Sequence, residues 1–224
     1  MERYVVRVWL PDRPGALGLV ASRIGAVRAE IIGIEILEHG AGRAIDELVV
    51  ELPDPTLLKL LVDEVNTVDG VDVEDVRPAP ATLRDPRVDA LETVATLVEL
   101  SSDDEMLSAL VAHVRVDFEG DWAAVIGRDG PGVAASLGPV PSAAWLQAFL
   151  DGSRSSATTT AGALRDPDDM AWAPLAGVGL DLVLGRHGRP LRDRERRQLM
   201  ALGRIVGARL RQLGVVPSVG VTGP

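Results

Sequence analysis

Apolar and polar residues alternate along the first third of the chain with two periods, one typical of strands and one typical of helices. The two-residue period predicts four strands, at Arg3–Leu10, Ile31–Glu38, Ala44–Leu52 and Val71–Val76. Between them, apolar residues recur every three or four positions, which predicts helices at Ala16–Arg28 and Pro55–Val65. Asp54 is the predicted N-cap of the second helix. This strand-helix-strand-strand-helix-strand order is typical of the ferredoxin-like fold, an antiparallel sheet with two helices on one face.

The second half of the chain has a different order of elements. Helical spacing begins at Val88 and resumes after Ser102, which stands three residues before Glu105 as in a capping box. Short apolar runs then predict four strands, of which the last is apolar enough to be central: Asp121–Gly127, Val133–Leu137, Ala171–Leu175 and Val178–Leu184. We expect two further helices, a short one over Ser142–Leu150 and a long one capped by Asp193, with a polar loop over Asp151–Asp169.

Proline marks the boundary between these halves. Three prolines lie in the segment from Arg77 to Pro86, where they disfavour helix and remove backbone donors. We therefore expect a first domain over residues 1–77, a linker over 78–87 and a second domain over 88–214. The last ten residues, 215–224, have no helical period, and we expect a disordered tail.

Charge and composition exclude several functions. The net charge of −10 and the isoelectric point of about 4.8 argue against binding to nucleic acid or to an anionic membrane surface. Cysteine is absent, and the three histidines lack metal-ligand spacing, so we expect no metal and no cofactor. The sequence has no signal peptide and no long apolar span, so we expect the chain to be cytoplasmic.

The segment between the first strand and the first helix carries the most informative chemistry. Its sequence Asp12-Arg13-Pro14-Gly15 contains a residue that fixes φ and one that lets a ligand approach the backbone closely. It leads into a helix whose free N–H groups and dipole suit a carboxylate, while Asp12 suits an ammonium group. The candidate ligand-binding residues here are Asp12, Arg13, Pro14, Gly15, Ala16 and Leu17.

This loop and the order of elements around it resemble those of ACT domains, small regulatory modules that bind amino acids. The resemblance covers about Arg3 to Arg77 and implies a dimer. It also implies that the ligand lies between the loop and the start of the second strand of a partner subunit, here Glu30, Ile31 and Ile32. Many ligand-binding members carry Asn where this chain has Glu30. A carboxylate at this position would repel the carboxylate of a ligand, or would prefer a cationic group.

The second half resembles a shortened GAF domain, a small-molecule-sensing fold with a central antiparallel sheet. Three segments carry this likeness: Trp172–Leu175, Gly179–Arg186 and Pro190–Asp193. Trp122, Trp145 and Trp172 line a pocket in one interpretation and fill the core in the other.

Together these features predict an α+β protein with a ferredoxin-like, ACT-like domain and a GAF-like domain. The predicted function is that of a non-catalytic sensor, a homodimer that binds an amino acid or a similar small molecule at its interface. The alternative is a ligand-free dimerisation scaffold for a partner protein, because the same turn chemistry is common between a strand and a helix. An enzyme is not expected, since no acid, base, nucleophile or metal set is assembled.

Overall fold

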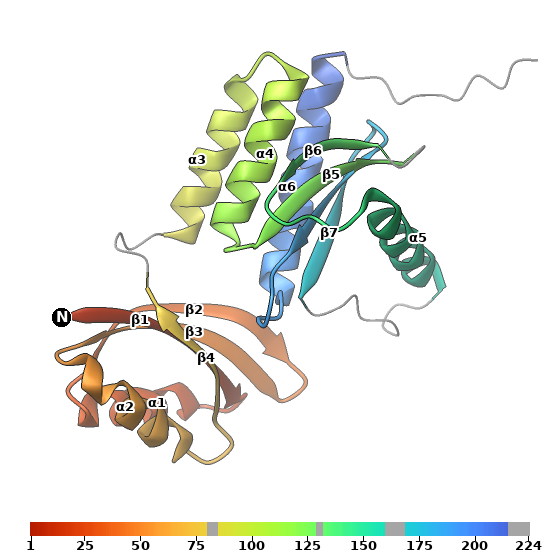
Figure 1. Cartoon of the computed structure of the whole chain (residues 1–224). Helices are drawn as coiled ribbons and strands as arrows, with labels where there is room; N and C mark the ends of the chain where they lie inside the picture. The colour runs from red at the N-terminus through yellow and green to blue at the C-terminus, as the bar shows by residue number, and fades with distance from the viewer. Residues whose placement is uncertain (80–84, 129–131, 160–168, 215–224) are drawn as a thin grey trace, which may run out of the picture. The chain divides into compact units, whose positions relative to one another are not determined.

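The computed structural model describes residues 1–79, 85–128, 132–159 and 169–214 (Figure 1). The chain divides into two compact units, Met1–Arg84 and Asp85–Pro224. Residues 80–84 of the predicted linker and the predicted tail, 215–224, lie outside the described residues. The other ends of the predicted linker belong to regular structure, since Pro78 ends a strand and Pro86 begins a helix.

The N-terminal unit has the predicted order of elements. Its members are β1 (Glu2–Pro11), α1 (Ala16–Ala26), β2 (Glu30–Gly40), β3 (Arg43–Leu52), the 3-10 turn η1 (Pro55–Leu57), α2 (Leu58–Asn66) and β4 (Asp72–Pro78). The strands pair antiparallel in the order β2-β3-β1-β4, and both helices cover one face of the sheet (Figure 1). The ferredoxin-like fold is therefore confirmed. Asp54 caps η1 as predicted, because its side chain accepts a hydrogen bond from Thr56 N.

Strand alternation places the core of this unit between the sheet and its helices. Val6 and Val8 of β1 are fully buried and lie opposite Leu48 and Asp46 of β3. Val20 and Ile24 of α1 pack on the same cluster. Successive residues of a strand point to opposite faces, so Arg7 and Trp9 belong to the other face of the sheet.

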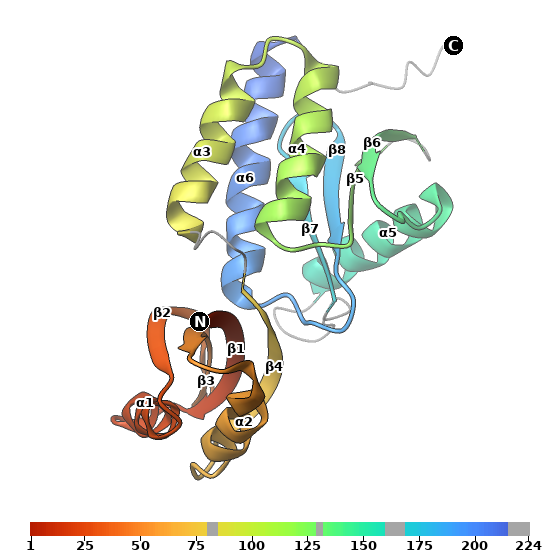
Figure 2. The same ribbon diagram turned by 60° about the vertical axis from the view of Figure 1, so that its left-hand side comes forward.

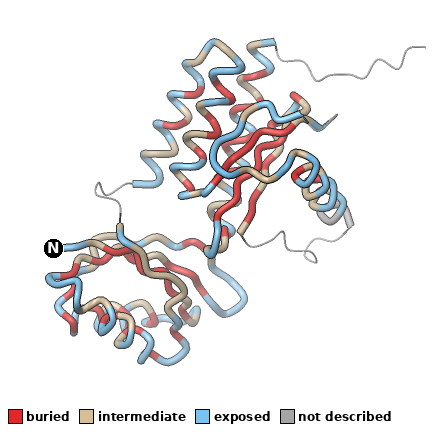
Figure 3. Tube along the Cα trace, viewed as in Figure 1, coloured by how far each residue is buried: buried red, intermediate tan, exposed pale blue. Residues whose placement is uncertain are grey.

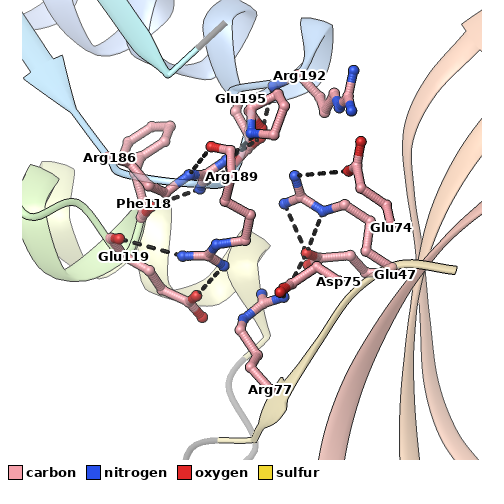
Figure 4. Close-up of polar contacts among 12 residues, drawn as sticks. Glu47, Glu74, Asp75, Arg77, Phe118, Glu119, Arg186, Arg189, Arg192 and Glu195 are labelled. Atoms are coloured by element: carbon pink, nitrogen blue, oxygen red, sulfur yellow. Dashed lines mark hydrogen bonds and ion pairs between the residues drawn. The ribbon is translucent and has the colours of Figure 1, made fainter.

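On that other face, arginine and carboxylate side chains alternate across three strands. Arg7 lies 2.8 Å from Glu47 and 3.7 Å from Glu74, while Arg77 lies 3.0 Å from Glu47 and 3.1 Å from Asp75 (Figure 4). Burial would raise the pKa of Glu47, but the guanidinium groups of Arg7 and Arg77 hold it below its ordinary value. The network therefore keeps Glu47 ionised.

The C-terminal unit is also an α+β structure. It consists of α3 (Pro86–Glu99), α4 (Asp103–Asp117), β5 (Trp122–Gly127), β6 (Val133–Leu137), α5 (Ala143–Thr159), β7 (Met170–Leu175), β8 (Leu180–Gly185) and α6 (Asp193–Gln212). Its antiparallel sheet has the order β6-β5-β8-β7, which confirms that the last predicted strand is central. Helices α3, α4 and α6 lie on one side of this sheet and α5 on the other (Figure 2). Buried residues follow the central strands (Figure 3).

Two predictions in this unit are wrong in their boundaries. Residues 151–159, expected as the start of a loop, continue α5, and residues 160–168 of that loop lie outside the described residues. Asp151 bonds Gln147 and Arg154 across helical turns, which supports the helix beyond Leu150. Asp193 is the first residue of α6 rather than its cap. Arg192 occupies the cap position, and its backbone N–H donates to Glu195.

The buried Arg186 joins the end of β8 to the start of α6. Its guanidinium donates to the backbone oxygens of Phe118, Arg189 and Pro190 and forms a 2.7 Å ion pair with Glu195 (Figure 4). A buried cation is tolerated only when it is paired and hydrogen-bonded, and this one is. Arg186 is therefore a structural anchor within the segment that carries the GAF-like resemblance.

Candidate functional site

The loop predicted to bind a ligand is tied to the turn between β2 and β3. Asp12 N donates to Gly42 O at 2.9 Å, and Arg13 N donates to Pro11 O at 2.8 Å. The Nε2 atom of His39, near the end of β2, lies 3.0 Å from Asp12 Oδ1. The carboxylate predicted to receive an ammonium group thus already has a neighbour, the imidazole of His39.

Gly15 gives the loop its shape. It occupies the left-handed region with φ of 87° and stands as the N-cap of α1, where no side chain caps the helix. A Cβ built on Gly15 would meet no atom within 4 Å, so open space lies against the backbone there. Ala16 is buried and Leu17 packs against the core, so these two residues offer a ligand their backbone rather than their side chains.

A residue that the sequence interpretation missed lies on the core-facing side of β3. Asp46 is only 3% exposed, and its Oδ1 atom is buried without a hydrogen-bond partner. It pairs with Val8 on one side and Ile36 on the other, toward the loop end of β1. Burial raises the pKa of Asp46, and His39 opposes this effect. The sequence contains one sign of this position. Strand alternation places Asp46 on the same face of β3 as the apolar Ala44, Leu48 and Val50, which is the face toward the core.

Glu30, Ile31 and Ile32 lie away from the loop within one chain. Glu30 pairs with Glu51 at one end of β2, whereas Gly40 pairs with Arg43 at the other end. Ten residues of strand separate these ends by about 33 Å. One chain therefore does not bring the two predicted halves of the site together, and their meeting across two subunits stays a prediction.

The three tryptophans proposed to line a pocket in the C-terminal unit do not form one cluster. Trp122 and Trp172 pack in the apolar layer between α5 and the sheet, while Trp145 is 47% exposed and stacks on Phe149. A Cβ on Gly185 would lie 2.2 Å from the Trp122 ring, so that ring fills the space above the glycine. These contacts favour the packing interpretation for Trp122.

The same layer contains a buried carboxylate held by two arginines. Asp181 of β8 is fully buried, and Arg128 Nη2 donates to its Oδ1 at 2.8 Å. Arg154 of α5 donates to the other carboxylate oxygen and lies 5.9 Å over the Trp172 ring. Asp181 thus fastens α5 to the sheet through a paired buried charge.

Among the described residues, no group of three or more histidine, cysteine or acidic side chains is arranged to hold a metal ion. Within the same residues, no helix has the length and apolar character needed to cross a membrane.

No protein-family model matches the chain, and the curated proteins contain no match. Among solved structures, the ACT domain of a GTP pyrophosphokinase from Chlorobium tepidum is 19% identical, with a TM-score of 0.29, over 35% of this chain and 97% of that one. An ACT domain protein from Streptococcus pneumoniae is 15% identical, with a TM-score of 0.30, over 37% of this chain and 98% of that one. An unknown protein from Galdieria sulphuraria matches 82% of this chain and 97% of its own, at 12% identity and a TM-score of 0.32.

The N-terminal third has the fold that the predicted resemblance to ACT domains implies. Its order of elements and its β2-β3-β1-β4 sheet carry this conclusion. The solved structures similar to this part of the chain include ACT domains. The GAF-like resemblance of the C-terminal unit is not confirmed, and it stays a prediction.

Proposed function

We propose that the N-terminal unit is a regulatory domain that binds an amino acid or a similar small molecule between two copies of the chain. The observation that carries this proposal is the open backbone at Gly15, placed at the uncapped start of α1. A ligand carboxylate would accept hydrogen bonds from the first N–H groups of α1, where the helix dipole favours negative charge.

The acidic side chains around the loop support a cationic group on the same ligand. Asp12 lies at the loop, and Asp46 is a buried carboxylate whose Oδ1 has no partner. An ammonium group that reached Asp46 would remove the cost of that orphaned oxygen. An α-amino acid in its zwitterionic form carries both groups on one molecule, since a single carbon atom joins its carboxylate and its ammonium group.

Exposed apolar side chains on the edge strand β2 support the proposed dimer. Ile34 and Ile36 pair with the core-facing Leu48 and Asp46, yet they are 52% and 53% exposed. Apolar residues exposed on an unpaired edge favour association with a second strand. If two β2 strands paired antiparallel about a two-fold axis near their middle, Glu30 of the partner subunit would come beside the loop end of β2. The site would then be complete only in the dimer, and Glu30 would add a second attraction for a cation.

Within this proposal the protein is not an enzyme, and the C-terminal unit transmits the signal or binds a partner protein. The test is thermal unfolding of the whole chain against each common amino acid at millimolar concentration. A ligand at 100 times its dissociation constant adds about 2.7 kcal/mol to the free energy of unfolding. An amino acid that raises the unfolding temperature would support the proposal.

The variant Gly15→Val locates the site. A β-branched residue is strained at a φ of 87° and fills the open space, so the ligand-induced shift should disappear. The matched control is Gly25→Ala, at the other end of α1 with no atom within 4 Å of the added Cβ, which should keep the shift. If no amino acid stabilises the wild-type chain, the ligand-free scaffold is the better description.

A further inference from the structure

Helix α3 of the C-terminal unit presents an apolar stripe to solvent. Val88, Leu91 and Val98 are 48%, 71% and 38% exposed, and Ala95 between them is also exposed. These four residues, the α3 stripe, follow spacings of three, four and three, which place them on one helix face in the pattern of a coiled-coil seam. The opposite face carries the buried Thr93 and Leu97. One face of α3 thus packs against the core of its own unit, and the opposite face is exposed to solvent.

We propose that the α3 stripe packs against the α3 stripe of a second copy of the chain, parallel and in register. This pairing goes beyond the proposed function, because it lies in the other unit and needs no ligand.

The charges beside the α3 stripe set the direction of the pair. Arg87 precedes the first stripe position, and Glu92 follows five residues later; both side chains are exposed. In a parallel pair, Arg87 of each helix faces Glu92 of the other, which gives two equivalent ion pairs. In an antiparallel pair centred on the stripe, Glu92 would instead face its own copy, and like charges would repel.

Hydrogen bonds to α4 and α6 fix the position of α3 within its own unit. Thr93 Oγ1 donates to Asp117 of α4 at 2.6 Å, and Arg209 of α6 donates to Leu100 O at 3.0 Å. A preformed helix loses little conformational entropy when it associates. Its 14 residues span about 21 Å, or two heptads. A parallel pair also brings both Pro86 residues to the same end of the α3 pair.

Disulfide trapping tests the geometry directly, because the chain has no cysteine of its own. In the whole chain at micromolar concentration, Leu91→Cys and Ala95→Cys should each form a disulfide-linked dimer under mild oxidation. The control is Val116→Cys, at an apolar residue of α4 that is 51% exposed. We expect the stripe variants to cross-link at least about tenfold faster than the control, since an in-register pair holds each cysteine near its own copy. Cross-linking no faster than the control would overturn the proposal. So would a preference of Leu91→Cys for Ala95→Cys over itself, which is the antiparallel outcome.

Charge reversal supplies an independent test by sedimentation equilibrium. Glu92→Arg and Arg87→Glu should each weaken the dimer about tenfold, and the double variant should restore it. The control Glu99→Arg changes an exposed acid that faces no arginine in the proposed pair and should leave the dissociation constant within about twofold. A double variant as weak as the single ones would overturn the pairing. The unfolding temperature of reduced Leu91→Cys is also measured with and without the amino acids. This measurement distinguishes a failure of the α3 pair from a failure of the proposed ligand site.

Discussion

Two consecutive acids on β3, Asp46 and Glu47, have opposite environments because their side chains lie on opposite faces of one sheet. Asp46 faces the core, where burial raises its pKa and one oxygen has no partner. Glu47 is also removed from water, but two arginines surround it and hold its pKa below its ordinary value. Ionisation of Asp46 therefore destabilises the folded state, whereas ionisation of Glu47 stabilises it.

Replacing Asp46 should therefore stabilise the N-terminal unit at neutral pH. Because the folded-state pKa of Asp46 is raised, the wild-type chain loses stability as the pH rises from about 4 through that pKa. Asp46→Asn removes the ionised form and should raise the free energy of unfolding by about 1 kcal/mol at pH 7. Hydrogen exchange of β1 and β3 amides measures this. An advantage of equal size at pH 3 and pH 7 would contradict the assignment.

Glu47→Gln should have the opposite effect. The lowered pKa of Glu47 means that its stabilisation is present above the unfolded value of about 4.5 and is lost as the pH falls through the folded value. The substitution should cost about 2 kcal/mol at pH 7, because it breaks charged hydrogen bonds to Arg7 and Arg77. The same exchange experiment should show the deficit shrinking in acid, and a constant deficit would point to lost packing instead.

At the scale of elements, α6 lies close to β7 because two of its residues are glycines. A Cβ on Gly203 would lie 2.8 Å from Pro174 O, and one on Gly207 would lie 2.3 Å from Ala176 N. Both obstacles are backbone atoms, which cannot rotate aside. The glycines cost the helix some propensity, and the close packing of the helix on the strand requires them.

We expect Gly207→Ala to destabilise the C-terminal unit by about 3 kcal/mol, since the added methyl group must push α6 away from β7. The control is Gly152→Ala in α5 of the same unit, where no atom lies within 4 Å of the new Cβ. That variant should be neutral or more stable by about 0.5–1 kcal/mol. Differential scanning calorimetry of both chains compares them. Equal unfolding temperatures would mean that α6 does not need the close approach.

At the scale of the whole molecule, the apolar side chains exposed among the described residues include groups on the edge strand β2 and on α3. Ile34 and Ile36 mark the first, and Leu91 marks the second. With a net charge of −10, two chains repel each other, so association must gain enough from apolar contact to overcome this repulsion. A dimer that formed both the β2 contact and the α3 contact would be more stable than a dimer with either contact alone. Once one contact forms, it raises the effective concentration of the groups that form the other.

Ile34→Glu should weaken the dimer and remove amino-acid stabilisation together, since the proposed ligand site needs both subunits. A buried charge at a strand edge opposes edge-to-edge pairing, and the effect on the dissociation constant should exceed about tenfold. Sedimentation equilibrium and thermal unfolding follow the two properties. Val116→Glu, a change at an exposed apolar residue of α4, serves as the control and should alter neither. A variant that stays monomeric and still binds its amino acid would place the whole site within one chain.

The local pattern of the sequence was enough for most elements. Apolar period and cap chemistry predicted every strand of both sheets and the helix starts at Asp54 and Ser102, because these signals act over a few neighbouring residues. The same reasoning ended α5 too early, since residues 151–159 are polar and lack a long apolar stripe. It also chose Asp193 as a cap, where the hydrogen bond from Arg192 N to Glu195 sets the start of α6 one residue earlier.

The sequence by itself determined the order of elements and the Asp12-Arg13-Pro14-Gly15 loop, because strand period, helix period and turn chemistry are properties of nearby residues. Only the tertiary structure decided what surrounds that loop. Strand register buried Asp46 beside Ile36, joined His39 to Asp12 and placed Glu30 at the far end of β2. Register is set by pairing between residues distant in sequence, so a period of two can give the face of a residue but not its neighbours across the sheet.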